Sequence, residues 1–135
     1  MTYLVDVNVL CEPTKQSPNQ RVNEWIINNR TELAVDPIIM GEIWEGIVRL
    51  PDGKRRQNLM EWYRQSRTAI LCLPWTLETG IIWGELSHKA TQGGFTISVE
   101  DSKIAATAKL HNLTVATRNV DDFTRCGVPV VNPFV

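Results

Sequence analysis

Short apolar runs alternate with helical patterns along the chain, and this alternation predicts parallel strand–helix–strand units. Tyr3–Val5 is a continuous apolar run, which is typical of a strand covered on both faces. Four later runs also predict strands: Leu33–Val35, Ala69–Leu73, Thr114–Thr117 and Val128–Val131. The last contains a proline, which places it at a sheet edge. The pattern predicts a three-layer α/β/α sandwich around a mostly parallel sheet of about five strands.

Capping residues and apolar residues at helical spacing predict the intervening helices. The pairs Ser17–Pro18 and Asp36–Pro37 each join a capping residue to a first-turn proline, ahead of apolar residues three or four positions apart. Further helices are expected over residues 54–66, from Thr76 to about Ala90, and from Ser98 toward the strand at Thr114. No repeat or linker interrupts this pattern, so a single domain is expected over residues 1–135.

Polar side chains follow the predicted strands at the edge where open parallel sheets place their ligands. Asp6 follows the first strand, and Asn119 and Asp122 follow the fourth. Asp101 lies in the first turn of the helix that leads into the fourth strand. Glu42 lies about a turn and a half into the helix after the second strand. We expect the topology to bring these distant positions to one edge.

Each of these residues also has a simpler structural interpretation. Asp6 can close an Asx-turn with the amide of Asn8. The acid of the capping-box pattern Ser98–Asp101 can complement a helix N-terminus. Glu42 can be a solvated helix residue, and Asn119 is a common turn residue. Taken singly, none of them identifies a function.

Four segments together carry a resemblance to a known family. They are Tyr3–Leu10, Met40–Ile47, Asp101–Ala108 and Thr117–Phe123, supported by Leu50–Arg56 and Val131–Pro133. In combination, order and spacing the chain resembles a PIN domain, specifically the VapC-type toxins of prokaryotic toxin–antitoxin pairs, over essentially its whole length. The resemblance implies a PIN-like fold and a metal-dependent endoribonuclease, acting on single-stranded or structured RNA, that a cognate antitoxin holds inactive.

The resemblance assigns roles residue by residue. Asp6, Glu42 and Asp101 match the family's three acids, and Asn119 falls where the family has a fourth polar ligand, either Asp or Asn. Ligands that are all oxygens favour a hard ion, Mg²⁺ or Mn²⁺. We expect Asp6 and Asp101 to be direct ligands. Glu42 is expected to bind through water or to position the attacking water, and Asn119 to orient the site.

The chain departs from the family pattern at two positions. Val7 stands where many members have a threonine whose hydroxyl supports the site. The fourth position carries no charge, so either Asn119 acts as a neutral ligand or Asp122 assists as an extra acid.

Basic and aromatic residues provide candidate RNA contacts. Arg118, Lys103 and Lys54–Arg56 are candidates for phosphate binding, although a charged run is as often a solvated surface. Trp44 lies near Glu42 in sequence and is the tryptophan best placed to stack on an unpaired base. The other four tryptophans are expected in the core or in a protein interface.

Charge and cysteine content exclude several classes. The formal net charge is −1, which disfavours a protein that merely coats nucleic acid, because such proteins are usually basic. Cys11, Cys72 and Cys126 lack the close pairs of a zinc site and are odd in number, as expected for a cytoplasmic protein. No apolar run is long enough to span a membrane, and the N-terminus lacks the basic region of a signal peptide.

The expected partners are an RNA substrate, a cognate antitoxin and a second copy of the chain in a homodimer. Two other classes remain as alternatives. One is a catalytically inactive PIN-like interaction protein. The other is a receiver-like signalling domain, which requires an acid after a central strand, whereas the third strand here ends in Leu73–Trp75. A DNA nuclease or RNA-processing enzyme would share the same acidic site.

Overall fold

Five short strands form one fully parallel sheet in the order β3-β2-β1-β4-β5. The computed structural model describes all residues, 1–135. The strands are β1 (Tyr3–Val5), β2 (Leu33–Val35), β3 (Leu71–Cys72), β4 (Thr114–Ala116) and β5 (Val130–Val131). β1 is central and pairs with β2 on one side and β4 on the other. This arrangement confirms the predicted α/β sandwich with about five parallel strands.

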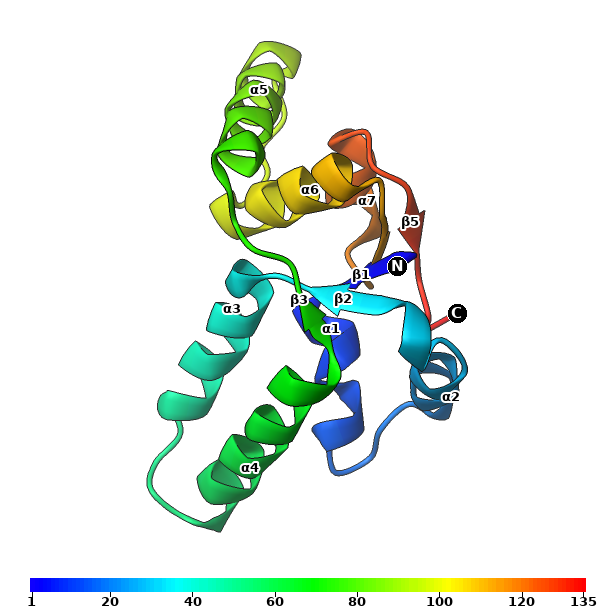
Figure 1. Ribbon diagram of the computed structural model, residues 1–135, viewed down its shortest axis with the longest axis vertical. Coiled ribbons are helices and arrows are strands. Elements are labelled where there is room, and N and C mark those ends of the chain that lie inside the picture. The colour runs from blue at the N-terminus through cyan, green and yellow to red at the C-terminus, as the bar shows by residue number, and fades with distance from the viewer.

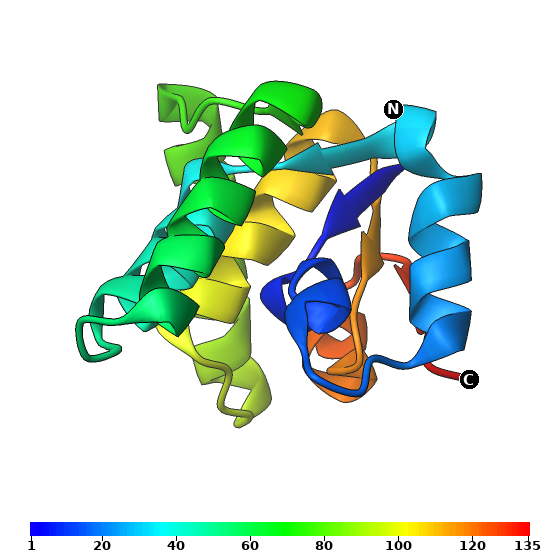
Figure 2. The same ribbon diagram turned by 90° about the horizontal axis from the view of Figure 1, so that it is seen from below.

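Helices cover both faces of the sheet. They are α1 (Val7–Leu10), α2 (Gln20–Asn28), α3 (Pro37–Val48), α4 (Lys54–Ala69), α5 (Leu77–Gly93), α6 (Val99–His111) and α7 (Val120–Arg125), with short 3₁₀ turns η1 (Glu12–Thr14) and η2 (Arg30–Glu32). Figure 1 shows α1, α2 and α4 on one side of the sheet and α6 and α7 on the other. The helices α3 and α4 lie side by side in both views (Figures 1 and 2). None of these helices has the length and apolar character needed to cross a lipid bilayer.

Most of the predicted helix starts are confirmed. The Asp36 side chain accepts a hydrogen bond from Ile39 N at the start of α3, and Thr76 and Ser98 cap α5 and α6 in the same way. The prediction at Ser17–Pro18 is wrong, because Asn19 is the cap of α2 and its side chain accepts from the first-turn amides. Asparagine is an equally good cap, so the sequence offered two adjacent candidates.

The two edge strands are shorter than predicted. β3 covers Leu71–Cys72 rather than Ala69–Leu73, and both of its residues are exposed. β5 covers Val130–Val131 rather than Val128–Val131. An edge strand pairs on one side only, so its length depends on one neighbour rather than on its own apolar run. The prediction that β5 lies at an edge is confirmed.

A core of 22 buried residues fixes the sheet between its helices. Leu4 and Val5 of β1 and Val115 of β4 are fully buried, as expected for strands covered on both faces. Ile39 of α3 and Ile104 of α6 pack into the same core with no exposed surface. This packing makes α3 and α6 rigid supports for the polar residues at the carboxyl edge of the sheet.

Candidate active site

The carboxyl ends of β1 and β4, the second turn of α3 and the first turn of α6 meet at one edge of the sheet. The structure brings Asp6, Glu42, Asp101 and Asn119 together there. Asn119 is hydrogen-bonded to Asp101, and burial together with the charges of Asp6 and Asp101 raises the pKa of Glu42. The four residues come from segments separated by up to about a hundred positions, and the parallel topology places them on the same side.

Asp6 is 5% exposed and held by three donors. Val7 N donates to Oδ1 at 2.8 Å, the Thr117 hydroxyl donates to Oδ2 at 2.7 Å, and the Asn8 amide donates to Oδ2 at 3.2 Å. Burial raises the pKa of Asp6, and these hydrogen bonds oppose the rise. The Asx-turn with the backbone amide of Asn8 is not formed, because Asp6 instead caps α1 through Val7 N. The carboxylate is therefore fixed in orientation.

Glu42 has one carboxylate oxygen, Oε1, that is buried without any hydrogen-bond partner. Burial raises the pKa of Glu42 to about 7, and the neighbouring charges of Asp6 and Asp101 add to the rise. A solvated helix-surface residue would show neither feature. A buried acceptor without a donor is destabilising, so this oxygen is open to a ligand from outside the chain.

Asp101 combines the expected helix-capping position with a contact across the site. Its backbone N–H donates to the Ser98 hydroxyl at 3.1 Å, while its Oδ2 accepts from Asn119 Nδ2 at 2.8 Å. The same Asn119 amide donates to Asp122 Oδ2 at 2.9 Å. Burial raises the pKa of Asp101 to about 6, and the charges of Asp6 and Asp122 contribute. The neutral amide thus bridges two carboxylates.

Two cavities flank Glu42. One, of about 320 Å³, has only polar residues and a glycine in its wall: Glu42, Glu45, Gly46, Arg49, Ser98, Glu100 and Asp101. The other, of about 200 Å³, is mostly apolar and includes Val7, Cys11, Leu59 and Trp62. Glu42 lines both, so it stands at the boundary between an open acidic cavity and an apolar groove.

The donor set fits a hard divalent cation that keeps part of its water shell. Carboxylates outnumber cationic side chains in the cavity wall, where Arg49 is the only one, and burial together with the neighbouring carboxylate charges raises the pKa values of Glu42 and Asp101. No three Asp, Glu, His or Cys side chains are close enough to ligate one ion together. Mg²⁺ commonly binds through only one or two carboxylates and several waters, and this arrangement suits such an ion.

Two of the candidate basic residues stack on aromatic rings. The Arg118 guanidinium carbon lies 3.7 Å from the centroid of the Phe134 ring, and its backbone N–H donates to Asn8 Oδ1 at 3.0 Å. Arg118 is therefore attached to the Asp6 network while its side chain remains exposed. Lys103 Nζ lies 5.9 Å from the Trp83 ring centroid, on α6 two residues beyond Asp101.

The remaining candidates lie apart from the acids. Trp44 packs against Tyr63, with ring centroids 5.0 Å apart, and is 37% exposed. Its cavity, of about 250 Å³, is completed by arginines of α4 and contains none of the four site residues. At the start of α4, Arg55 donates to the Thr14 carbonyl and Arg56 pairs with Asp52. Trp44 and Glu42 lie two residues apart on α3, but their side chains line different cavities.

Sequence reasoning missed Thr117. Its side chain is fully buried, donates to Asp6, and accepts from Asn119 N at 2.9 Å and from Asn8 Nδ2 at 3.2 Å. This hydroxyl supports Asp6 although the residue after Asp6 is Val7. A signal was present, since Thr117 follows β4 as Asp6 follows β1.

The chain belongs to the PIN domain family, whose model matches residues 3–128. It is 35% identical to Toxin FitB of Neisseria gonorrhoeae over 97% of each chain. It is also 33% identical to VapC ribonuclease Y4jK of Sinorhizobium fredii, over 97% of this chain and 96% of that one.

Solved structures agree with this assignment. A chain of FitAB bound to an IR36 DNA fragment superposes with a TM-score of 0.93 at 33% identity, covering 99% of this chain and 96% of that one. A chain of VapBC2 from Rickettsia felis bound to a promoter DNA fragment has a TM-score of 0.83 at 19% identity, with 98% of each chain covered. The second match shows that the fold persists at low sequence identity.

Proposed function

We propose that this chain is a Mg²⁺- or Mn²⁺-dependent endoribonuclease and the toxin of a toxin–antitoxin pair. The observation that carries the proposal is the buried, unpartnered Oε1 of Glu42 beside two further carboxylates, with the pKa of Glu42 raised to about 7. A divalent cation neutralises such a cluster. The named activities of the relatives, a toxin and a VapC ribonuclease, support RNA as the substrate.

Each site residue has a role that its contacts allow. Asp6, locked by three donors, and Asp101, bridged to Asn119, would hold the ion directly. Glu42 would orient a water, because its free oxygen faces no protein donor. Asn119 would keep Asp101 in place. When bound, the ion supplies positive charge for the scissile phosphate and lowers the pKa of a bound water.

Two protein partners follow from the same proposal. Similar chains occur in structures of FitAB and of VapBC, a family of toxin–antitoxin systems. The apolar cavity beside Glu42 would accept a helix or extended segment of the antitoxin, with a basic side chain reaching the acids. We also propose that residues 1–135 act as one domain within a homodimer.

Cleavage of RNA by the purified chain tests the activity. We expect cleavage that requires Mg²⁺ or Mn²⁺ and stops when EDTA is added. Asp6→Asn should abolish cleavage and leave the thermal unfolding of the metal-free protein unchanged or slightly improved, because a repulsive charge is removed. Cleavage that persists in EDTA would rule out the metal mechanism, and unfolding of Asp6→Asn would assign Asp6 a structural role.

Assembly is tested by light scattering of the chain alone and with the product of the neighbouring small reading frame. We expect a dimer alone and a larger complex with that product. A strict monomer at micromolar concentration in both samples would contradict the proposed partners. Growth arrest on expression of the chain, relieved by co-expression of its neighbour, is the expected result in cells.

A further inference from the structure

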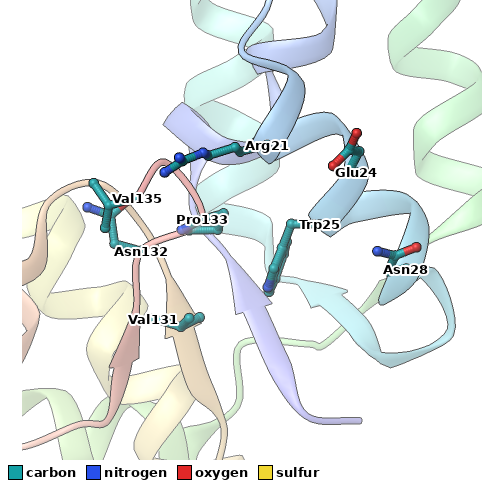
Figure 3. A pocket seen from close by; sticks show the side chains of 8 residues that line it. All are labelled: Arg21, Glu24, Trp25, Asn28, Val131, Asn132, Pro133 and Val135. Carbon is teal, nitrogen blue, oxygen red and sulfur yellow. The ribbon is translucent and has the colours of Figure 1, made fainter.

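A cavity of about 410 Å³ lies between α2 and the segment that follows β5, outside the acidic site. Its volume is in the range of small-ligand pockets. Its wall contains Arg21, Glu24, Trp25 and Asn28 of α2 and Val131, Asn132, Pro133 and Val135 of the C-terminal segment. In Figure 3 the Arg21 side chain extends toward the C-terminal residues, and Glu24 and Asn28 lie on the other side of Trp25.

Arg21 is an exposed cation with no assigned role. Its guanidinium makes no ion pair with any carboxylate of the chain, although Glu24 lies in the same wall. Only its backbone N–H is engaged, donating to Asn19 Oδ1 at 2.9 Å. A guanidinium in this state is free to bind an anion, and phosphate oxygens match its geometry.

Trp25 provides a fixed flat surface in the same cavity. Trp25 and Tyr3 of β1 make an edge-to-face aromatic contact, with ring centroids 4.9 Å apart and ring planes at 68°. The Trp25 ring is half-buried, so part of it remains accessible from the cavity. A tryptophan held in this way can stack on any nucleobase, because every base has a π face.

A chain of contacts joins this cavity to the acidic site. Asn132, in the wall, accepts a hydrogen bond from Phe134 N at 3.0 Å, and the Phe134 ring carries the guanidinium of Arg118. Arg118 lies between Thr117 and Asn119 in the chain, and both contact the carboxylates or their partners. Asn132 follows β5 as Asp6 follows β1, so this end of the cavity and the acids lie at the same edge of the sheet, and Arg118 contacts both networks.

We propose that this α2 pocket binds a nucleotide of single-stranded RNA that flanks the cleaved bond, with Arg21 on a phosphate and Trp25 against the base. The proposal rests on the proposed ribonuclease function and extends it to a second binding position on the same strand. Arg118 lies on the path between the pocket and the acids. RNA is favoured over a peptide because the wall joins an unpaired guanidinium to a flat ring and side-chain amides.

RNA binding without cleavage tests the pocket. Full-length Asp6→Asn protein is titrated in Mg²⁺ buffer against a fluorescent pool of randomised twelve-nucleotide RNA, at several salt concentrations. Adding Arg21→Ala should weaken binding about five- to tenfold and reduce the slope of log K against log salt by about 0.7, the value for one phosphate contact on a single strand. Arg30→Ala is the matched control, because Arg30 is also exposed but follows the other end of α2. It should change neither quantity.

A second measurement covers Trp25, whose replacement could unfold the protein because it packs on Tyr3. Cross-linking of 4-thiouridine RNA to the Asp6→Asn protein should give an adduct within residues 21–28. Equal losses with Arg21→Ala and Arg30→Ala, or no adduct there, would overturn the pocket while leaving the ribonuclease intact. Unchanged RNA binding with weakened antitoxin binding would assign the pocket to a protein and also overturn it. A folded protein that binds no RNA would overturn the ribonuclease as well.

Discussion

Two acids attached to the same helix, Asp36 at the N-terminus of α3 and Glu42 further along it, differ in how their oxygens are satisfied. Asp36 is fully buried, yet Oδ1 accepts from Ile39 N at 2.9 Å and Oδ2 accepts from the Thr107 hydroxyl at 2.7 Å. Glu42 is only partly buried, yet its Oε1 has no partner. Burial alone therefore does not distinguish these two acids of α3, whereas their unsatisfied hydrogen-bonding capacity does.

The Asp36 contact also explains how the site is held together. Thr107 belongs to α6, the helix that carries Asp101, and Asp36 caps α3, the helix that carries Glu42. The buried hydrogen bond between Thr107 and Asp36 thus joins the two helices that carry the site residues. The hydrogen bond between Asp36 and Thr107 holds the two helices together, and Glu42 Oε1 remains available to a ligand.

The largest expected effect is on RNA cleavage, at the site acid Asp101. Asp101→Asn keeps the size of the side chain and the helix cap, which uses the backbone N–H. We expect RNA cleavage to fall by at least about a hundredfold, since a proposed metal ligand loses its charge. Circular dichroism and thermal unfolding should remain as in the parent. Cleavage within a few-fold of the parent would leave Asp101 as a helix-capping residue only.

The next effect is on stability at the satisfied acid. Asp36→Ala removes the cap of α3 and leaves the buried Thr107 hydroxyl and Ile39 N–H without their acceptor. We expect the free energy of unfolding in urea to fall by about 2–4 kcal/mol. Asp36→Asn is the matched control and should cost much less, because an amide oxygen still accepts from Ile39 N. A loss below about 0.5 kcal/mol for Asp36→Ala would show that Asp36 does not stabilise the fold.

The sequence predicted the parts of the fold that depend on local pattern. The bounds of β1 and β2 are as predicted. Each is a short apolar run that is covered on both faces of the sheet, so the length of the run matches the length of the strand. Asp36, Thr76 and Ser98 act as caps because capping uses backbone groups within one turn. β3 was overextended because the length of an edge strand depends on its neighbour, which sequence periodicity does not report.

The site was predictable in position but not in connectivity. The topology of a parallel sheet places residues that follow β1 and β4 side by side, so the convergence of Asp6 and Asn119 follows from the strand pattern. The support of Asp6 by Thr117 joins residues 111 positions apart, and the Asn119 bridge joins Asp101, 18 positions away, to Asp122, three positions away. The sequence pattern does not report which of these side chains meet.

A smaller effect concerns the pH dependence of the metal-free protein. The pKa of Glu42 rises from an ordinary 4.5 to about 7 on folding, so the folded chain holds this proton more tightly than the unfolded chain. The free energy of unfolding should therefore fall as pH rises from about 4.5 through about 7. Glu42→Gln should remove part of this fall and, at pH 8, stabilise the metal-free protein by on the order of 1 kcal/mol, allowing for solvent screening. Thermal melts in EDTA between pH 4.5 and 8 measure it, and identical pH profiles for the two proteins would contradict it.

The smallest effect separates the two candidates for the fourth site residue. Asn119 donates to both Asp101 and Asp122, so either the amide completes the site or Asp122 contributes its own charge. We expect Asn119→Ala to weaken Mn²⁺ binding by about tenfold, at the lower end of the loss that is usual for a residue that orients a metal ligand. Asn119→Asp should tighten binding by adding charge beside the ion.

Asp122→Asn should have a mild effect, because Asp122 also lies 3.7 Å from Arg125 and serves as part of the first turn of α7. Titration of Mn²⁺ into these variants and into Asp101→Asn measures the loss of metal affinity caused by each substitution. If Asp122→Asn binds Mn²⁺ as poorly as Asp101→Asn, then Asp122 rather than Asn119 is the fourth residue.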